Sequence, residues 1–165
     1  MVNLAVGDLV VYGVHGPGTV EARETRRVHG EERTVVVVAL AGGLSVQLPL
    51  PLAREQLRPL LDEAGIATIE QVLCDRPPPS GESWLKRHRE SQAKLGHALG
   101  LAEIIRDGSI REAAPARRGG GARLSPSERE LLRRARVLLT TEIALARDVS
   151  IEDAEMWIER QLAPS

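Results

Sequence analysis

The sequence predicts an α+β fold in which a small β domain precedes an all-helical domain. Residues 1–50 consist of short apolar and β-branched runs separated by glycine and proline, a pattern typical of strands and turns. From residue 80 onward, apolar residues recur at helical spacing. The 165 residues include no Phe, one Tyr and two Trp, so both cores must be built from Leu, Val, Ile and Ala.

The N-terminal runs predict four or five antiparallel strands. The candidate strands are residues 8–12, 18–28, 32–40 and 44–50. In the last of these, Leu44, Val46 and Leu48 alternate with Ser45 and Gln47, which is the pattern of a half-buried strand. So many short strands in about 50 residues predict a strongly bent sheet or a small barrel.

A segment without strand alternation follows, with a short helix expected at 66–74. The sequence "RPPP" at 76–79 cannot continue a helix and is expected to act as a stiff spacer. We therefore predict a β domain over 1–60, a connecting helix and proline-rich linker over 61–79, and a helical domain over 80–165.

The helical domain is predicted to begin with a helix from Ser80 to about Leu95 and a short helix over 99–106. Residues 107–123 contain three consecutive glycines and no periodicity, so we expect a basic loop there. Ser125 and Glu128 predict a capping box that opens a long helix. The expected buried stripe of this helix is Leu132, Ala135, Leu139, Ile143 and Ala146, and that of a last helix capped by Ser150 is Ile151, Ala154, Trp157, Ile158 and Leu162.

Charge is distributed unevenly although the net charge is only −1. Residues 84–136 carry 13 cations and 6 anions, whereas residues 137–165 carry 2 cations and 6 anions. Within the basic block, Arg129, Arg133 and Arg136 stand at i, i+4 and i+7 and predict one face of a helix. Such a block is either a solvated helix surface or a binding surface for a polyanion.

Trp84 stands in "SGESWLKRHRE" without an apolar companion on its own helical face, since its neighbours there are Arg87, His88 and Ser91. It either packs against another helix or is exposed and functional. An exposed ring beside Arg87 and Arg89 could stack on a base or enter an opened step, while arginines neutralise phosphates. We therefore expect a preference for distorted or melted duplex.

Other functional classes find little support. The sequence has no nucleophile, phosphate-binding or metal-ligand motif, so no catalytic residue, cofactor or metal is predicted. Cys74 is the only cysteine, which favours a reducing compartment, and we expect it to be buried. No apolar run approaches the roughly 18 residues of a membrane span, so we expect a cytoplasmic protein without a membrane partner.

The sequence resembles the CarD family of bacterial transcription regulators along nearly its full length. The resemblance rests on "VGDLVVYGVHGPGTVEARETR" (6–26), "LSVQLPL" (44–50), "SWLKRHRES" (83–91), "LAEIIRD" (101–107) and "LSPSERELLRRARVLLTTEIALA" (124–146). The N-terminal part is similar to the polymerase-interacting domain of transcription-repair coupling factors. The resemblance implies a Tudor-like, SH3-like barrel followed by a helical DNA-binding domain.

The resemblance also implies a function and its residues. The N-terminal domain would bind the RNA polymerase β subunit by strand addition, through Arg26, Val46, Gln47 and Leu48. The helical domain would bind promoter DNA in the minor groove at the upstream edge of the bubble, with Trp84 as a wedge that stabilises the open complex. The expected DNA-binding residues are Trp84, Lys86, Arg87, Arg89, Arg129, Arg133 and Arg136. We expect a nucleoid-associated monomer.

Two features depart from the family pattern. Gln47 stands where relatives carry an arginine, so the contact with the polymerase would be neutral rather than charge-assisted. The segment 108–123 is longer and richer in glycine than the corresponding connection. An alternative function is that of an adaptor that binds the polymerase without inserting Trp84 into DNA.

Overall fold

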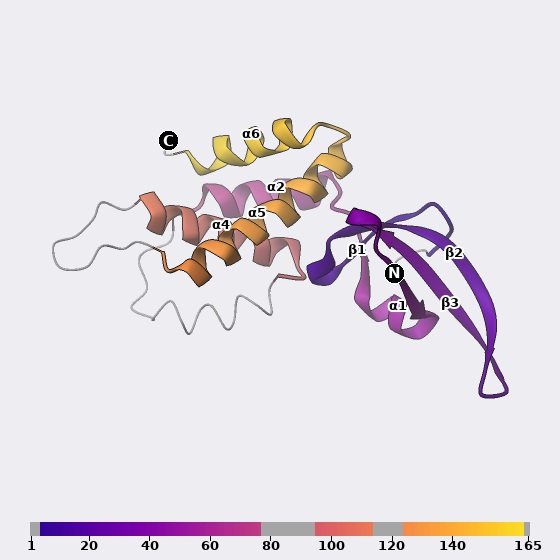
Figure 1. The fold of residues 1–165 in the computed structure, drawn as a ribbon. Coiled ribbons are helices and arrows are strands. Elements are labelled where there is room, and N and C mark those ends of the chain that lie inside the picture. Colours follow the sequence, from indigo (N-terminus) through magenta and orange to yellow (C-terminus); the bar gives the residue numbers. More distant parts are fainter. Residues whose placement is uncertain (1–3, 77–94, 114–123, 164–165) are drawn as a thin grey trace. The chain divides into compact units, whose positions relative to one another are not determined.

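The computed structural model describes residues 4–76, 95–113 and 124–163 (Figure 1). The chain divides into two compact units, Met1–Leu60 and Leu61–Ser165. The first unit contains strands and the second contains helices, which confirms the α+β class. No helix in the described ranges is long and apolar enough to span a membrane.

The first unit is a five-stranded antiparallel sheet. Its strands are β1 (Leu9–Tyr12), β2 (Pro17–Val28), β3 (Glu31–Leu40), β4 (Ser45–Pro49) and β5 (Leu57–Pro59). Their order in the sheet is β4-β3-β2-β1-β5. The strand pattern leaves open a bent sheet or a small barrel, and the structure has the open sheet, not the barrel that the family resemblance implied. β4 and β5 are the two outer strands of the sheet: β4 pairs with β3 and β5 pairs with β1, and the two do not pair with each other. The sequence also missed β5 and the helix α1 (Leu50–Gln56) that connects it to β4.

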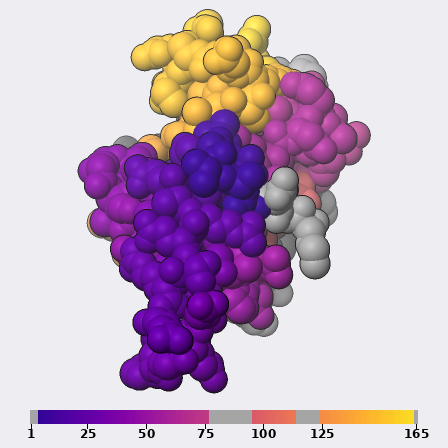
Figure 2. All heavy atoms as spheres, turned by 90° about the vertical axis from the view of Figure 1, so that its right-hand side faces the viewer, coloured from indigo at the N-terminus to yellow at the C-terminus, as the bar shows by residue number. Residues whose placement is uncertain are grey.

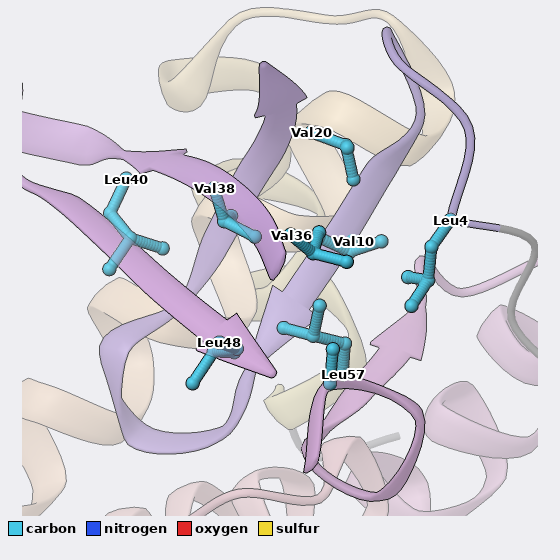
Figure 3. Close-up of a cluster of buried hydrophobic side chains, with 9 residues drawn as sticks. Leu4, Val10, Val20, Val36, Val38, Leu40, Leu48 and Leu57 are labelled. Atoms are coloured by element: carbon cyan, nitrogen blue, oxygen red, sulfur yellow. The ribbon is translucent and has the colours of Figure 1, made fainter. Parts of the chain in front are cut away.

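One face of this sheet and α1 enclose an aliphatic core (Figure 3). The core consists of Leu4, Val10, Val20, Val36, Val38, Leu40, Leu48, Ala53 and Leu57. Val46 and Leu50 pack against this cluster from positions that are partly buried. Tyr12 also packs against the cluster from a partly buried position. At about 25 cal/mol per Å² of apolar surface, the branched aliphatic side chains supply most of the apolar burial that stabilises this small unit.

The β2–β3 hairpin is much longer than the strands beside it. His29 and Gly30 form its two-residue turn with φ angles of 52° and 82°, which allow the strands to keep their twist. The pairing of β3 with β4 covers only Val35–Ala39 of β3. The far part of the hairpin is therefore a two-stranded ribbon, visible as a narrow projection (Figure 2).

Four described helices form the second unit. They are α2 (Glu63–Cys74), α4 (Ala98–Ala113), α5 (Pro126–Arg147) and α6 (Ile151–Leu162). α4 contacts α2 and α5, and α6 contacts α5 and α2 (Figure 1). Although the sequence assigned it to a connecting segment, α2 thus packs inside the helical unit. Glu142 of α5 is buried, and its Oε1 accepts a hydrogen bond of 3.1 Å from the backbone N–H of Leu61.

α4 is longer than predicted, because residues 107–113 continue the helix instead of starting a loop. Gly108 explains the difference. Its Cα–H surface faces Leu132 of α5 so closely that an added Cβ would lie 2.9 Å from Leu132 Cδ1. Packing of the two helices over this glycine compensates for its low helix propensity.

Burial predictions for three residues are corrected. Cys74 is exposed, because it is the last residue of α2 and Leu73 takes the buried position. In α6, Ala154 and Ile158 are buried as predicted, whereas Ile151 is exposed because it begins the helix. Trp157 is only partly buried, and the guanidinium of Arg147 lies 5.0 Å from its ring centroid, a cation–π contact.

Gly18 provides a test of the close approach of β2 to β3. An alanine Cβ at this position would lie 2.7 Å from the carbonyl oxygen of Ala39. We expect Gly18→Ala to lower the free energy of unfolding by about 1–3 kcal/mol through overpacking, measured by urea denaturation. Glu21→Ala, at an exposed position of the same strand, should change it by less than about 0.5 kcal/mol. An unchanged urea midpoint for Gly18→Ala would contradict the register.

Candidate functional site

The outer edge of β4 can receive another strand. The N–H of Leu40 donates a 2.7 Å hydrogen bond to the carbonyl of Leu44, next to the pairs Ala39–Ser45 and Val38–Val46. Because hydrogen-bonded pairs alternate with non-hydrogen-bonded pairs in an antiparallel ladder, the N–H and C=O of Ser45 and Gln47 point away from β3. In the described part of the chain, β4 pairs only with β3, so its other edge is unpaired.

The side chains of β4 divide between the core and the surface. Leu48 is 5% exposed and Val46 packs against the core, so both side chains face the interior. Of the three β4 residues predicted to bind the polymerase, Val46, Gln47 and Leu48, only Gln47 has its side chain on the exposed face of the strand. Val46 and Leu48 can thus support this edge by anchoring it to the core, while contacts with a partner would come from Gln47 and from the backbone.

Arg26 of β2 reaches the same edge. Its Nη1 donates a 2.7 Å hydrogen bond to Oε1 of Gln47, and its Nε and Nη2 donate to Oε2 of Glu24 at 3.0 and 2.6 Å. The structure therefore brings Arg26 and Gln47 together although 21 positions separate them in the sequence. Sequence reasoning missed Glu24, whose spacing of two residues from Arg26 places both on one face of a strand.

The second candidate surface lies on α5. Its start is fixed by the predicted capping box: Oγ of Ser125 accepts from the N–H of Glu128 at 3.3 Å, and Oε2 of Glu128 accepts from the N–H of Ser125 at 2.9 Å. Arg129 lies in the first turn after this cap and is exposed. Arg133 is exposed too, and Arg136 is partly buried, with 33% of its side chain accessible.

Two of these three arginines already form ion pairs with carboxylates of the protein. Nη2 of Arg133 lies 2.6 Å from Oε1 of Glu130, and Arg136 forms an ion pair with Glu159 of α6. Arg129 has no ion pair among the described residues, and neither does the exposed Arg134, which sequence reasoning omitted. Its position one residue after Arg133 could have identified it as another exposed cation.

A groove of 310 Å³ runs between α5 and α6 beside these arginines. Both Arg133 and Arg136 line it, together with Val137, Thr140, Glu155, Ile158 and Glu159. The groove thus combines two cations and two carboxylates with the side chains of Val137, Thr140 and Ile158. A phosphate that entered the groove could pair with Arg133 or Arg136 only by displacing the carboxylate that now pairs with that arginine.

Four predicted DNA-binding residues, Trp84, Lys86, Arg87 and Arg89, lie outside the described residues. Within the described ranges, no group of three or more His, Cys, Asp or Glu side chains could hold a metal ion. The two surfaces that remain suit binding: a strand edge that can pair with an extended chain, and a row of arginines that can pair with phosphates.

Comparison with known proteins matches each unit separately. Residues 4–61 match the model of the CarD-like/TRCF RID domain, and residues 68–159 match the model of the CarD C-terminal domain. A Bacillus subtilis (strain 168) protein named "Putative transcription factor YdeB" is 23% identical over 149 residues, which cover 88% of this chain and 93% of that protein.

The Arg133–Glu130 pair leads to a pH prediction. The hydrogen bond from Arg133 lowers the pKa of Glu130, with further contributions from the charges of Arg133 and Arg134. Because the folded-state pKa is below the unfolded one, the pair stabilises the fold at neutral pH and this contribution disappears as the pH falls through the lowered pKa. Carboxyl NMR titration should show the pKa of Glu130 rising in Arg133→Gln. A pKa that is equal in both proteins would contradict the pair.

Proposed function

Because the chain belongs to the CarD family of non-catalytic transcription regulators, we propose that it joins the RNA polymerase β subunit to promoter DNA and stabilises the open complex. Its N-terminal unit is an RNA polymerase-interaction domain. The observation that carries the proposal is the match of both units, over residues 4–61 and 68–159, to the two domains of one family.

The polymerase would bind at the β4 edge. A strand of the β subunit would pair with the outward N–H and C=O groups of Ser45 and Gln47, which is β-augmentation. Arg26, held beside Gln47 by a 2.7 Å hydrogen bond, would contact polar side chains of the added strand. The burial of Leu48 supports this arrangement, because it fixes the position of the strand before the partner arrives.

The helical unit would bind DNA through phosphates and one aromatic wedge. Arg129, with Arg133 and Arg136 on the same side of α5, supplies sequence-independent affinity by releasing counterions from phosphates. Trp84 would enter the minor groove at the upstream edge of the bubble, with Lys86, Arg87 and Arg89 on the flanking phosphates. Insertion costs a few kcal/mol in intact duplex and less where the strands have already parted, so the protein would favour the melted state.

The adaptor function remains the second candidate, favoured by one observation. Arg133 and Arg136 are engaged by Glu130 and Glu159, so the cationic surface of α5 is partly neutralised within the unit. If DNA cannot displace these carboxylates, the polymerase-interaction domain would act with the helices as a spacer.

Substitution of Trp84 separates the two candidates. We expect Trp84→Ala to bind the polymerase normally but to lose the stabilisation of open complexes, because the wedge is gone. The measurement is the lifetime of promoter complexes after a heparin challenge, with wild type, variant and no added protein. Wild-type protein that leaves lifetimes unchanged on several promoters would refute open-complex stabilisation, whereas equal activity of Trp84→Ala would favour the adaptor.

Proline substitution tests strand addition at β4. Gln47→Pro removes an N–H that points away from β3, so the sheet should stay folded while an added strand loses a hydrogen bond. Gln47→Ala keeps this N–H and removes only the side-chain contact with Arg26. We expect co-purification with the β subunit to fall strongly for Gln47→Pro and for Arg26→Glu, and less for Gln47→Ala. Circular dichroism checks the fold, and folded Gln47→Pro that retains the β subunit fully would exclude pairing at this edge.

A further inference from the structure

The ion pair between α5 and α6 lies where DNA is proposed to bind. Arg136 contacts Glu159 across the groove that also contains Arg133 and Glu155. Glu159 comes from α6, an element that no step of the proposed DNA contact requires. The side chains of Arg136 and Glu159 are 33% and 59% accessible, so the pair is open to water and to ligands.

The surface of α6 is strongly acidic beside this pair. Glu152, Asp153, Glu155 and Glu159 are all exposed on the helix, with Arg160 as its one cation. The first two lie in the first turn, where carboxylates are favoured by the helix dipole, so their presence has a structural explanation. Glu155 and Glu159 lie beyond that turn and line the groove with the arginines.

We propose that Glu159 acts as an internal competitor of DNA phosphate for Arg136, so that α6 lowers the affinity of the helical unit for DNA. The inference rests on the proposed DNA-binding function and adds a residue that limits it. A guanidinium binds carboxylate and phosphate with the same paired N–H groups, so only one of them can hold Arg136 fully at a time. This competition weakens binding to ordinary duplex. Binding at a promoter would be less affected, because the polymerase and Trp84 would add further contacts there.

The competition has a signature in the salt dependence. When a phosphate pairs with an uncommitted arginine, it releases condensed cations, and each such contact adds about 0.9 to the slope of log affinity against log salt. When the phosphate must displace Glu159, the freed carboxylate attracts a cation from solution and part of this gain is lost. Removing the charge of Glu159 should therefore raise both the affinity and the slope.

The experiment compares Glu159→Gln with Glu152→Gln in the full-length protein. Both variants remove one negative charge from α6, but Glu152 lies outside the groove. Fluorescence anisotropy with a labelled duplex that contains a bubble is measured at several KCl concentrations. For Glu159→Gln we expect about two- to fivefold tighter binding at low salt and a slope steeper by up to about 0.9. Glu152→Gln should change affinity less than twofold and leave the slope unchanged.

The double variant Glu159→Gln/Arg136→Gln supplies the second test. It should not show the tighter DNA binding expected for Glu159→Gln, because Arg136, the arginine that Glu159 pairs with, is absent. Equal effects of Glu159→Gln and Glu152→Gln, or a gain that persists in the double variant, would overturn the competition. Circular dichroism first checks that the wild-type and Glu159→Gln proteins are folded. If both folded proteins fail to bind the bubble duplex, the proposed DNA binding itself is refuted. If both bind with equal affinity and equal salt slope, only the role of Glu159 is refuted.

Discussion

Burial of one face of each element against the core of its own unit is the constraint on which the binding surfaces depend. In β4, Leu48 is buried and Val46 packs on the same core, so the strand is anchored by its side chains. In α5, Leu132, Ala135 and Leu139 are buried, and the arginines are thereby directed to the remaining surface. Apolar packing thus fixes which backbone and charged groups are available to partners.

The polymerase-interaction domain and the helical unit present different chemistry. The strand edge offers directional hydrogen bonds, which require an extended partner in register. The arginines offer charge, which is tolerant of sequence and sensitive to salt. If both act together, attachment to the polymerase would raise the effective concentration of the helical unit near the promoter, and weak DNA contacts would then suffice.

The charge distribution fits weak DNA contact. A net charge of −1 gives the chain no general attraction to DNA, and the acidic end of the sequence lies on α6 beside the arginines of α5. Local cations can still bind phosphates because screening limits repulsion from distant carboxylates to about 8–10 Å. Binding would consequently depend on the geometry of a few groups and less on the overall charge.

Much of the fold could be read from the sequence. Alternation predicted β4, helical spacing predicted α5 and its buried stripe, and the capping box at Ser125 fixed where α5 begins, since all three depend on neighbours within one turn or strand. The choice of an open sheet over a barrel, the continuation of α4 to Ala113 and the exposure of Cys74 could not be predicted in this way.

The same division holds for the candidate site. The family resemblance predicted Arg26 and Gln47 as polymerase contacts, and helical spacing predicted that Arg129, Arg133 and Arg136 share one face of α5. Only the tertiary structure decided that Gln47 accepts a hydrogen bond from Arg26, that Leu48 faces the core and that Glu159 pairs with Arg136. These contacts join residues far apart in the chain, and their formation depends on how whole strands and helices pack, which a local pattern of residues does not encode.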